Sequence, residues 1–165
     1  MNTTEFLTIS SAICPDQTAI VFEGKRFSFA QLGERTNRLA NALTGLGVAR
    51  GDSVALLQVN CNECIEAYFA TAKLGAMYVP LNFRAKGNEL TYMLNTADTK
   101  VIFVGDRYTE IIDSIRNDLT SVEHFVSIDG PREGWTDYAA LMAAASDEDV
   151  FTDIDDDDIT ILMYT

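Results

Sequence analysis

The stretch from Gly51 to Arg84 constrains the fold more than any other part of the chain, because it contains a strand, a helix and a second strand with few residues between them. Residues 53–59 form a nearly continuous apolar run, which is typical of a strand buried on both faces of a parallel sheet. Residues 77–81 form a second short strand. Such a βαβ crossover is almost always right-handed, so the sequence predicts a twisted parallel sheet with helices on its faces.

The helix of this unit is predicted from its cap and its periodicity. Asn60 is expected to cap the first turn, with Glu63 completing a capping box. Glu66 falls on the solvated side, and Gly75 ends the helix in a left-handed conformation. The face expected to pack on the sheet consists of four apolar residues at helical spacing, Ile65, Tyr68, Phe69 and Ala72.

Similar patterns predict the elements on either side of this unit. Residues 19–29 are expected to form a hairpin that turns at Glu23 and Gly24 and covers an edge of the sheet. Ser28 and Gln31 form a capping box for a helix that ends at Gly47. The remaining expected elements are helices over 89–97, 108–119 and 135–146, and strands over 100–104, 124–128 and 159–164. The predicted fold class is α/β, with a mostly parallel twisted sheet, helices on both faces and an N-terminal β-hairpin.

The charge of the chain excludes several kinds of partner. Its 165 residues include 25 acidic side chains and 12 Lys or Arg, which gives a formal net charge of −13. Such a chain repels the phosphates of nucleic acids and anionic lipids. No apolar run reaches membrane-spanning length, and the first ten residues lack the pattern of a signal peptide, so we expect a cytoplasmic protein without a membrane span.

The cysteines leave two interpretations open. Cys61 and Cys64 form a C-x-x-C motif at a strand-to-helix junction, where thioredoxin-like dithiols also lie. The third cysteine, Cys14, forms no second pair, which favours packing over a redox site.

The acidic run at 147–158 lacks the glycine and distant glutamate of a calcium loop, so we expect it to be solvated. His124, the only histidine, is expected to be structural.

Four stretches together resemble the adenylate-forming superfamily, in particular the stand-alone AMP-forming acyl-CoA synthetases. They are Pro15 to Ile20, FSFAQL at 27–32, GDSVALLQVN followed by EAYFATAKLGAMYVPLNFR, and DDDDITILMYT at 155–165. The last is similar to the approach to the phosphate-loop signature of the family, whose Ser/Thr/Gly-rich part would follow Thr165. The resemblance covers nearly the whole chain. The sequences AKLG and LNFR favour a ligase for fatty or aryl acids over an amino-acid-activating module.

The resemblance implies that residues 1–165 are the N-terminal portion of the AMP-binding domain, ending before the phosphate loop. The parent enzyme would use ATP, Mg and coenzyme A to convert a small carboxylic acid into acyl-CoA, AMP and pyrophosphate through an acyl-adenylate. The catalytic and metal-binding residues would lie beyond this chain. We therefore expect the chain alone to be inactive, to bind none of these molecules and to self-associate through surfaces that the remainder would cover.

Four residues are candidates for binding, two from the resemblance and two from their position after strands. Tyr164 and Thr165 match the start of the signature and would position the nucleotide loop; the alternative is the end of a core strand. Arg84 and Arg107 each follow a predicted strand end, where ligands collect, and either guanidinium would suit the phosphates of coenzyme A. The alternative for both is a solvated surface arginine. Two other functions stay open at this point, a non-catalytic flavodoxin-like interaction domain and a thiol redox protein that uses Cys61 and Cys64.

Overall fold

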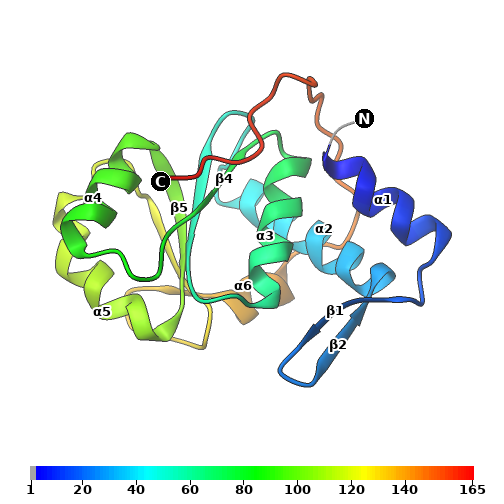
Figure 1. The fold of residues 1–165 in the computed structure, drawn as a ribbon, viewed down its shortest axis with the longest axis horizontal. Coiled ribbons are helices and arrows are strands. Elements are labelled where there is room, and N and C mark those ends of the chain that lie inside the picture. The colour runs from blue at the N-terminus through cyan, green and yellow to red at the C-terminus, as the bar shows by residue number, and fades with distance from the viewer. Residues whose placement is uncertain (1–2) are drawn as a thin grey trace.

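The central element of the fold is a five-stranded parallel sheet, seen in a computed structural model that describes residues 3–165 (Figure 1). The strand order is β4-β3-β5-β6-β7, and each neighbouring pair is parallel. The strands are β3 (Ser53–Leu57), β4 (Met77–Pro80), β5 (Thr99–Val104), β6 (His124–Ser127) and β7 (Thr136–Asp137). The helices are α1 (Thr3–Ile13), α2 (Phe29–Gly45), α3 (Asn62–Lys73), α4 (Gly87–Thr96), α5 (Asp106–Ile115) and α6 (Tyr138–Ala144), with a short 3-10 turn, η1 (Arg116–Asp118). The predicted α/β class is confirmed, although α1 was not expected.

The core consists of two apolar layers, one on each face of the sheet. Alternate residues of β3 point to opposite faces, so Val54 packs with α2, α3 and α6, whereas Ala55 packs with α4 and α5. Figure 1 shows α4 and α5 on one side of the sheet and α2 and α3 on the other. Because both faces are covered, the central strands need apolar residues at every position. This explains the continuous apolar runs in the sequence.

The predicted β3-α3-β4 unit is confirmed, but two details of its helix are wrong. Cys61, not Asn60, occupies the N-cap position of α3, and its side chain makes no capping hydrogen bond. Ile65 is 40% exposed, whereas Glu66 is fully buried at 0%. The helix approaches the core through small residues such as Ala70, and an arginine on α2 neutralises Glu66. A prediction from amphipathic periodicity places every carboxylate on the solvent side of a helix. It is wrong for Glu66, because Arg35 pairs with this carboxylate inside the protein.

The hairpin forms as predicted from β1 (Thr18–Phe22) and β2 (Lys25–Ser28), with positive φ angles of 47° at Glu23 and 79° at Gly24. Two such residues in succession form the turn that matches the twist of paired strands. The hairpin remains a separate two-stranded sheet that packs against α2, so the expected covering of a sheet edge is wrong. The capping box of Ser28 and Gln31 at the start of α2 is confirmed.

The helix expected from residue 135 begins three residues later. Residues 136 and 137 instead form β7, which pairs with β6. Asp137 then caps α6, because its carboxylate accepts a hydrogen bond from the backbone N–H of Ala140 at 3.0 Å. A strand of two residues is too short to produce a recognisable alternation, so the sequence pattern missed it.

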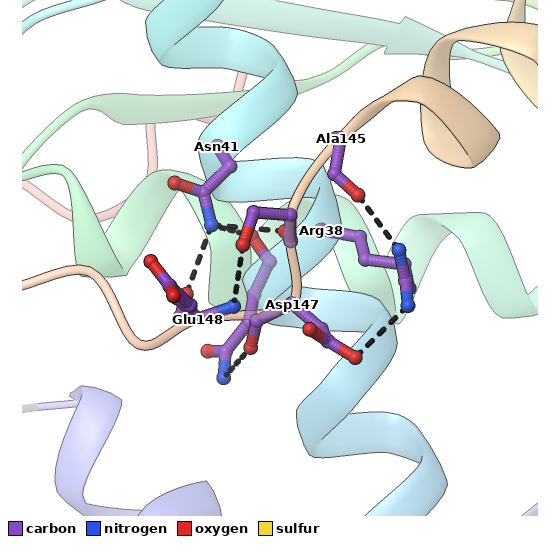
Figure 2. Close-up of polar contacts among 7 residues, drawn as sticks. Arg38, Asn41, Ala145, Asp147 and Glu148 are labelled. Carbon is purple, nitrogen blue, oxygen red and sulfur yellow. Dashed lines mark hydrogen bonds and ion pairs between the residues drawn. The ribbon is translucent and has the colours of Figure 1, made fainter.

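The acidic run is a largely exposed loop, as expected, but several of its residues also bind side chains of the helices. Figure 2 shows its first contacts, in which side chains of α2 donate hydrogen bonds to the chain after α6. Arg38 donates to the carbonyl oxygen of Ala145 at 2.7 Å and to the carboxylate of Asp147 at 2.9 Å. Asn41 donates to the carbonyl oxygen of Glu148 at 2.9 Å. The backbone therefore follows α2, although residues 146–149 are themselves exposed.

Two further basic side chains continue this contact toward the C-terminus. Lys73 pairs with Asp149, and Arg50 pairs with Asp155 at 2.6 Å and Asp158 at 2.8 Å. Each exposed ion pair contributes little by itself, about 0–1 kcal/mol. The ion pairs lie at several points along the acidic segment. Together they hold its backbone on a path that crosses the molecule and reaches the edge strand β4.

The final strand expected over 159–164 is wrong as a strand and is reduced to one parallel bridge beside β4. The backbone N–H of Tyr78 donates to Thr160 at 2.9 Å, and the N–H of Leu162 donates back to Tyr78 at 2.9 Å. The next ladder bond would need an N–H from Pro80, which has none. Ile161 and Met163 remain exposed at 37% and 66%. Self-association through this edge stays a prediction.

Acidification should loosen this segment. The hydrogen bond from Arg50 lowers the pKa of Asp158, so the contact stabilises the fold above the ordinary aspartate pKa and is lost as pH falls through the lowered value. We expect the hydrogen-exchange protection of the Leu162 amide to fall several-fold below about pH 4, and at neutral pH in the variant Arg50→Met. Protection that is the same in both proteins at every pH would exclude the tether.

Candidate functional site

A cavity of about 470 Å³ lies beyond the carboxyl end of β4 and contains three of the four predicted binding residues. Its wall combines the loop after β4, one side of α4 and the C-terminal segment. The lining residues are Asn82, Arg84, Ala85, Asn88, Glu89, Tyr92, Met93, Tyr164 and Thr165. The carboxyl edge of a parallel sheet is where α/β proteins bind ligands. This cavity is therefore the candidate functional site.

Arg84 brings a positive charge to the cavity. The side chain of Asn82 accepts a hydrogen bond from the backbone N–H of Arg84 at 2.9 Å, which fixes the turn after β4. The guanidinium carbon lies 5.4 Å from the centre of the Phe83 ring. Within residues 3–165 no carboxylate forms an ion pair with Arg84. A guanidinium without an internal counter-ion is well suited to a phosphate.

Tyr164 anchors the C-terminal segment on α4. Its hydroxyl donates to the carbonyl oxygen of Met93 at 2.9 Å, and its ring meets that of Tyr92 edge-on at 6.4 Å between centres. Burial and the neighbouring Tyr92 raise the pKa of Tyr164. The hydroxyl is therefore neutral and already engaged. Thr165, the next residue, is exposed and lines the cavity.

Arg107 lies in a different cavity from the other three residues. This second cavity, of about 380 Å³, opens at the carboxyl ends of β3 and β5 beside the hairpin. Its lining includes four carboxylates, Glu23, Glu63, Asp106 and Asp129, against two basic side chains, Lys25 and Arg107. The surplus of negative charge suits an anionic ligand less well than the first cavity does. The separation arises because β4 and β5 flank β3 on opposite sides, an order that periodicity cannot reveal.

A buried polar cluster around Glu66 was missed by the sequence analysis. Arg35 donates to both oxygens of the Glu66 carboxylate, at 2.7 and 3.0 Å. Asn62 donates at 2.7 Å and the hydroxyl of Tyr138 at 2.6 Å. The cluster thereby joins α2, α3 and α6. The available signal was the four-residue spacing of Asn62 and Glu66, which places both on one face of α3.

Burial and charge act together on the titration of this cluster. Burial lowers the pKa of Arg35, but the hydrogen bonds and charge of Glu66 outweigh that effect, so the net pKa is raised. Burial, followed by the charge of Glu66, raises the pKa of Tyr138 well above its ordinary value. Both side chains therefore donate to the carboxylate across the neutral pH range. The carboxylate is fully paired, and we assign the cluster to stability.

Three further expectations concern the role of His124, membrane-spanning helices and metal ligands. His124 begins β6 and is half-buried. Within the described residues, no helix is long and apolar enough to cross a membrane. Residues 3–165 likewise contain no group of three or more His, Cys, Asp or Glu side chains placed to hold a metal ion. The sequence analysis assigned no metal ligand in this chain.

Comparisons of this chain with family models and with known proteins point to the same family. The model of the AMP-binding enzyme family matches residues 8–165. The chain is 37% identical to an indoleacetate–CoA ligase of Aromatoleum aromaticum, covering 89% of this chain and 29% of the relative. It is 35% identical to a long-chain-fatty-acid–CoA ligase of Mycobacterium tuberculosis, with coverages of 85% and 27%.

The fold agrees with a solved structure of the same kind. The crystal structure of the anthranilate CoA ligase AuaEII in complex with anthranoyl-AMP superposes with a TM-score of 0.96 at 29% identity. That match covers 100% of this chain and 32% of the ligase. The chain thus spans roughly a third of the length of the proteins that it matches. The match to the family model extends over nearly all of its residues, and the chain belongs to the family of AMP-binding enzymes.

Proposed function

We propose that the chain is the N-terminal part of a larger enzyme. This enzyme joins a carboxylic acid, of the fatty or aryl class, to coenzyme A in a reaction that converts ATP into AMP and pyrophosphate. The two relatives described above are CoA ligases, and one structural neighbour is bound to an acyl-adenylate. The observation that carries the proposal is the meeting of Arg84, Tyr164 and Thr165 at one cavity. There the segment that resembles the approach to a phosphate loop ends beside a guanidinium.

The proposed reaction has two steps. The carboxylate first attacks the α-phosphorus of ATP, with Mg, to form the acyl-adenylate, and pyrophosphate leaves. The thiol of coenzyme A then attacks the carbonyl carbon, and AMP leaves. Adenylation is required because a carboxylate oxygen is a very poor leaving group. Since the reaction consumes ATP and coenzyme A, we propose that it takes place in the cytoplasm.

The described residues have limited roles in this proposal. Arg84 holds a phosphate of coenzyme A, Thr165 donates to a phosphate of ATP, and Tyr164 fixes the segment on α4 through Met93. These residues do not balance the charge of the triphosphate, so further groups outside residues 3–165 are needed. We therefore propose that residues 1–165 alone catalyse no turnover.

Product analysis tests the proposal. The full-length protein is incubated with ATP, Mg and coenzyme A and with a panel of aryl and fatty acids. We expect one AMP and one thioester per acid consumed, and no product from residues 1–165. ADP in place of AMP would overturn the adenylate route. The absence of any acid-dependent product across the panel would favour the non-catalytic interaction domain.

Replacing Arg84 with alanine in the full-length protein should raise the KM for coenzyme A several-fold with little change in kcat, because a phosphate contact made equally in the ground and transition states is lost. Steady-state kinetics with a saturating acid give both constants. Arg107→Ala is the matched variant, since it removes the same charge from the second cavity. An unchanged KM in Arg84→Ala with a raised KM in Arg107→Ala would move the phosphate site to the second cavity.

A further inference from the structure

Cys61 and Cys64 form a close pair of thiols at the start of α3. Their sulfur atoms lie 3.4 Å apart, and both are free and half-buried. Cys61 is the extended N-cap residue, with φ −149° and ψ 170°, and Cys64 lies in the first turn of the 12-residue helix. A disulfide needs about 2.05 Å between the sulfur atoms, so the two sulfur atoms must approach each other to form the bond.

The helix end and the sulfur contact favour one negative charge on the pair. The hydrogen bond from Cys61 lowers the pKa of Cys64 to about 7, while this contact and burial raise the pKa of Cys61. The N-terminal end of a helix also stabilises a thiolate. About half of the pairs would therefore carry a thiolate near pH 7, against roughly 3% for an ordinary cysteine.

Reagents reach Cys61 from the second cavity, which it lines, and the sulfur of Cys64 lies behind it at 3.4 Å. The four carboxylates of that cavity repel anionic oxidants and leave neutral ones unaffected. Cys14, in contrast, lies just after α1, donates to the carbonyl oxygen of Ser10 at 3.2 Å and has no cysteine partner among residues 3–165. The chain thus contains its own reference thiol.

We propose that Cys61 and Cys64 form a reversible dithiol site, which hydrogen peroxide or another neutral hydroperoxide oxidises to an intrachain disulfide. The thiolate of the pair attacks one peroxide oxygen, the O–O bond breaks, and the leaving hydroxide takes a proton to form water. The second thiol then attacks the resulting sulfenic sulfur, the S–S bond forms, and a second water leaves. Two thiols and one hydrogen peroxide give one disulfide and two waters, whereas an organic hydroperoxide gives one alcohol and one water. A dithiol reductant restores both thiols.

Peptide mapping tests this site in the purified chain. The reduced chain is treated with a small excess of hydrogen peroxide, and remaining thiols are blocked with N-ethylmaleimide before trypsin digestion. Cleavage after Arg50 and Lys73 releases both cysteines of the pair in peptide 51–73, while Cys14 is released in peptide 1–25. We expect peptide 51–73 to lose two hydrogen atoms and to escape blocking, several-fold faster than Cys14 is oxidised. Dithiothreitol should reverse the change.

Three variants make the result specific. Cys14→Ser should behave like the unmodified chain, whereas Cys61→Ser and Cys64→Ser should each form no intrachain disulfide. Unfolding in guanidinium should abolish the rate advantage over Cys14. Equal oxidation of Cys14 and the pair in the folded chain would overturn the proposal. So would full blocking of both thiols after peroxide treatment, or a disulfide that links Cys14 to either one.

Discussion

Replacing Glu66 with glutamine is expected to destabilise the chain by about 1.5–3 kcal/mol, because the buried carboxylate, whose side chain is 1% exposed, loses its charge-assisted hydrogen bonds. The new amide would also direct N–H groups at donors. Arg35, Asn62 and Tyr138 all donate to the carboxylate in the present structure. Urea unfolding followed by circular dichroism gives the free energy of unfolding of each protein.

Glu63 provides the matched control, because it lies on the same helix and acts on Arg35 and Tyr138 only through its charge, without a hydrogen bond to either. Glu63→Gln should change the free energy of unfolding by no more than about 0.5 kcal/mol. Equal stabilities for the two variants would show that the buried carboxylate does not hold α2, α3 and α6 together. The neutral isostere removes the charge and leaves the volume unchanged, so a cavity cannot explain the loss.

Replacing Phe103 with alanine is the second change for which we expect a large effect, about 3–5 kcal/mol of destabilisation. Phe103 is 1% exposed at the centre of the sheet, and its ring packs edge-on against that of Tyr138 with 5.7 Å between centres. Truncation would leave a cavity between β5 and α6, since neighbouring backbone in a central strand cannot collapse into the space.

Phe151→Ala removes the same group from a residue that is 89% exposed and serves as the control for Phe103→Ala. We expect a change within about 0.5 kcal/mol for Phe151→Ala in the same urea titration. A loss below about 1 kcal/mol in Phe103→Ala would mean that the layer under α2, α3 and α6 is loosely packed. Comparable losses in both variants would contradict the assignment of the core.

The elements that the sequence predicted well are those in which one face or both faces are apolar. The β3-α3-β4 unit and the hairpin turn at Glu23 and Gly24 follow from apolar runs and from residues that accept positive φ. The failures have local causes. Glu66 is buried because Arg35, far away in the sequence, neutralises it, and the final strand stops at one bridge because Pro80 lacks an N–H.

The candidate site was predicted in part for similar reasons. Arg84 and Arg107 both follow strands, and the rule that ligands collect there selected both. Which of them would lie beside Thr165 depends on strand order and on the route of the acidic segment. That route is set by ion pairs such as that between Arg50 and Asp158, which join distant parts of the chain. Hydrophobic periodicity contains no information about ion pairs between distant residues. The position of Thr165 relative to the two arginines could therefore be learned only from the structure.

The most direct test of the proposed function is the exchange of labelled pyrophosphate into ATP without coenzyme A. Exchange requires a reversible adenylation step, so it isolates the chemistry that unites the proposed reaction with this family. We predict exchange by the full-length protein that depends on the carboxylic acid, and none by residues 1–165. Exchange by the full-length protein that is independent of acid, or exchange catalysed by residues 1–165 alone, would contradict the proposal.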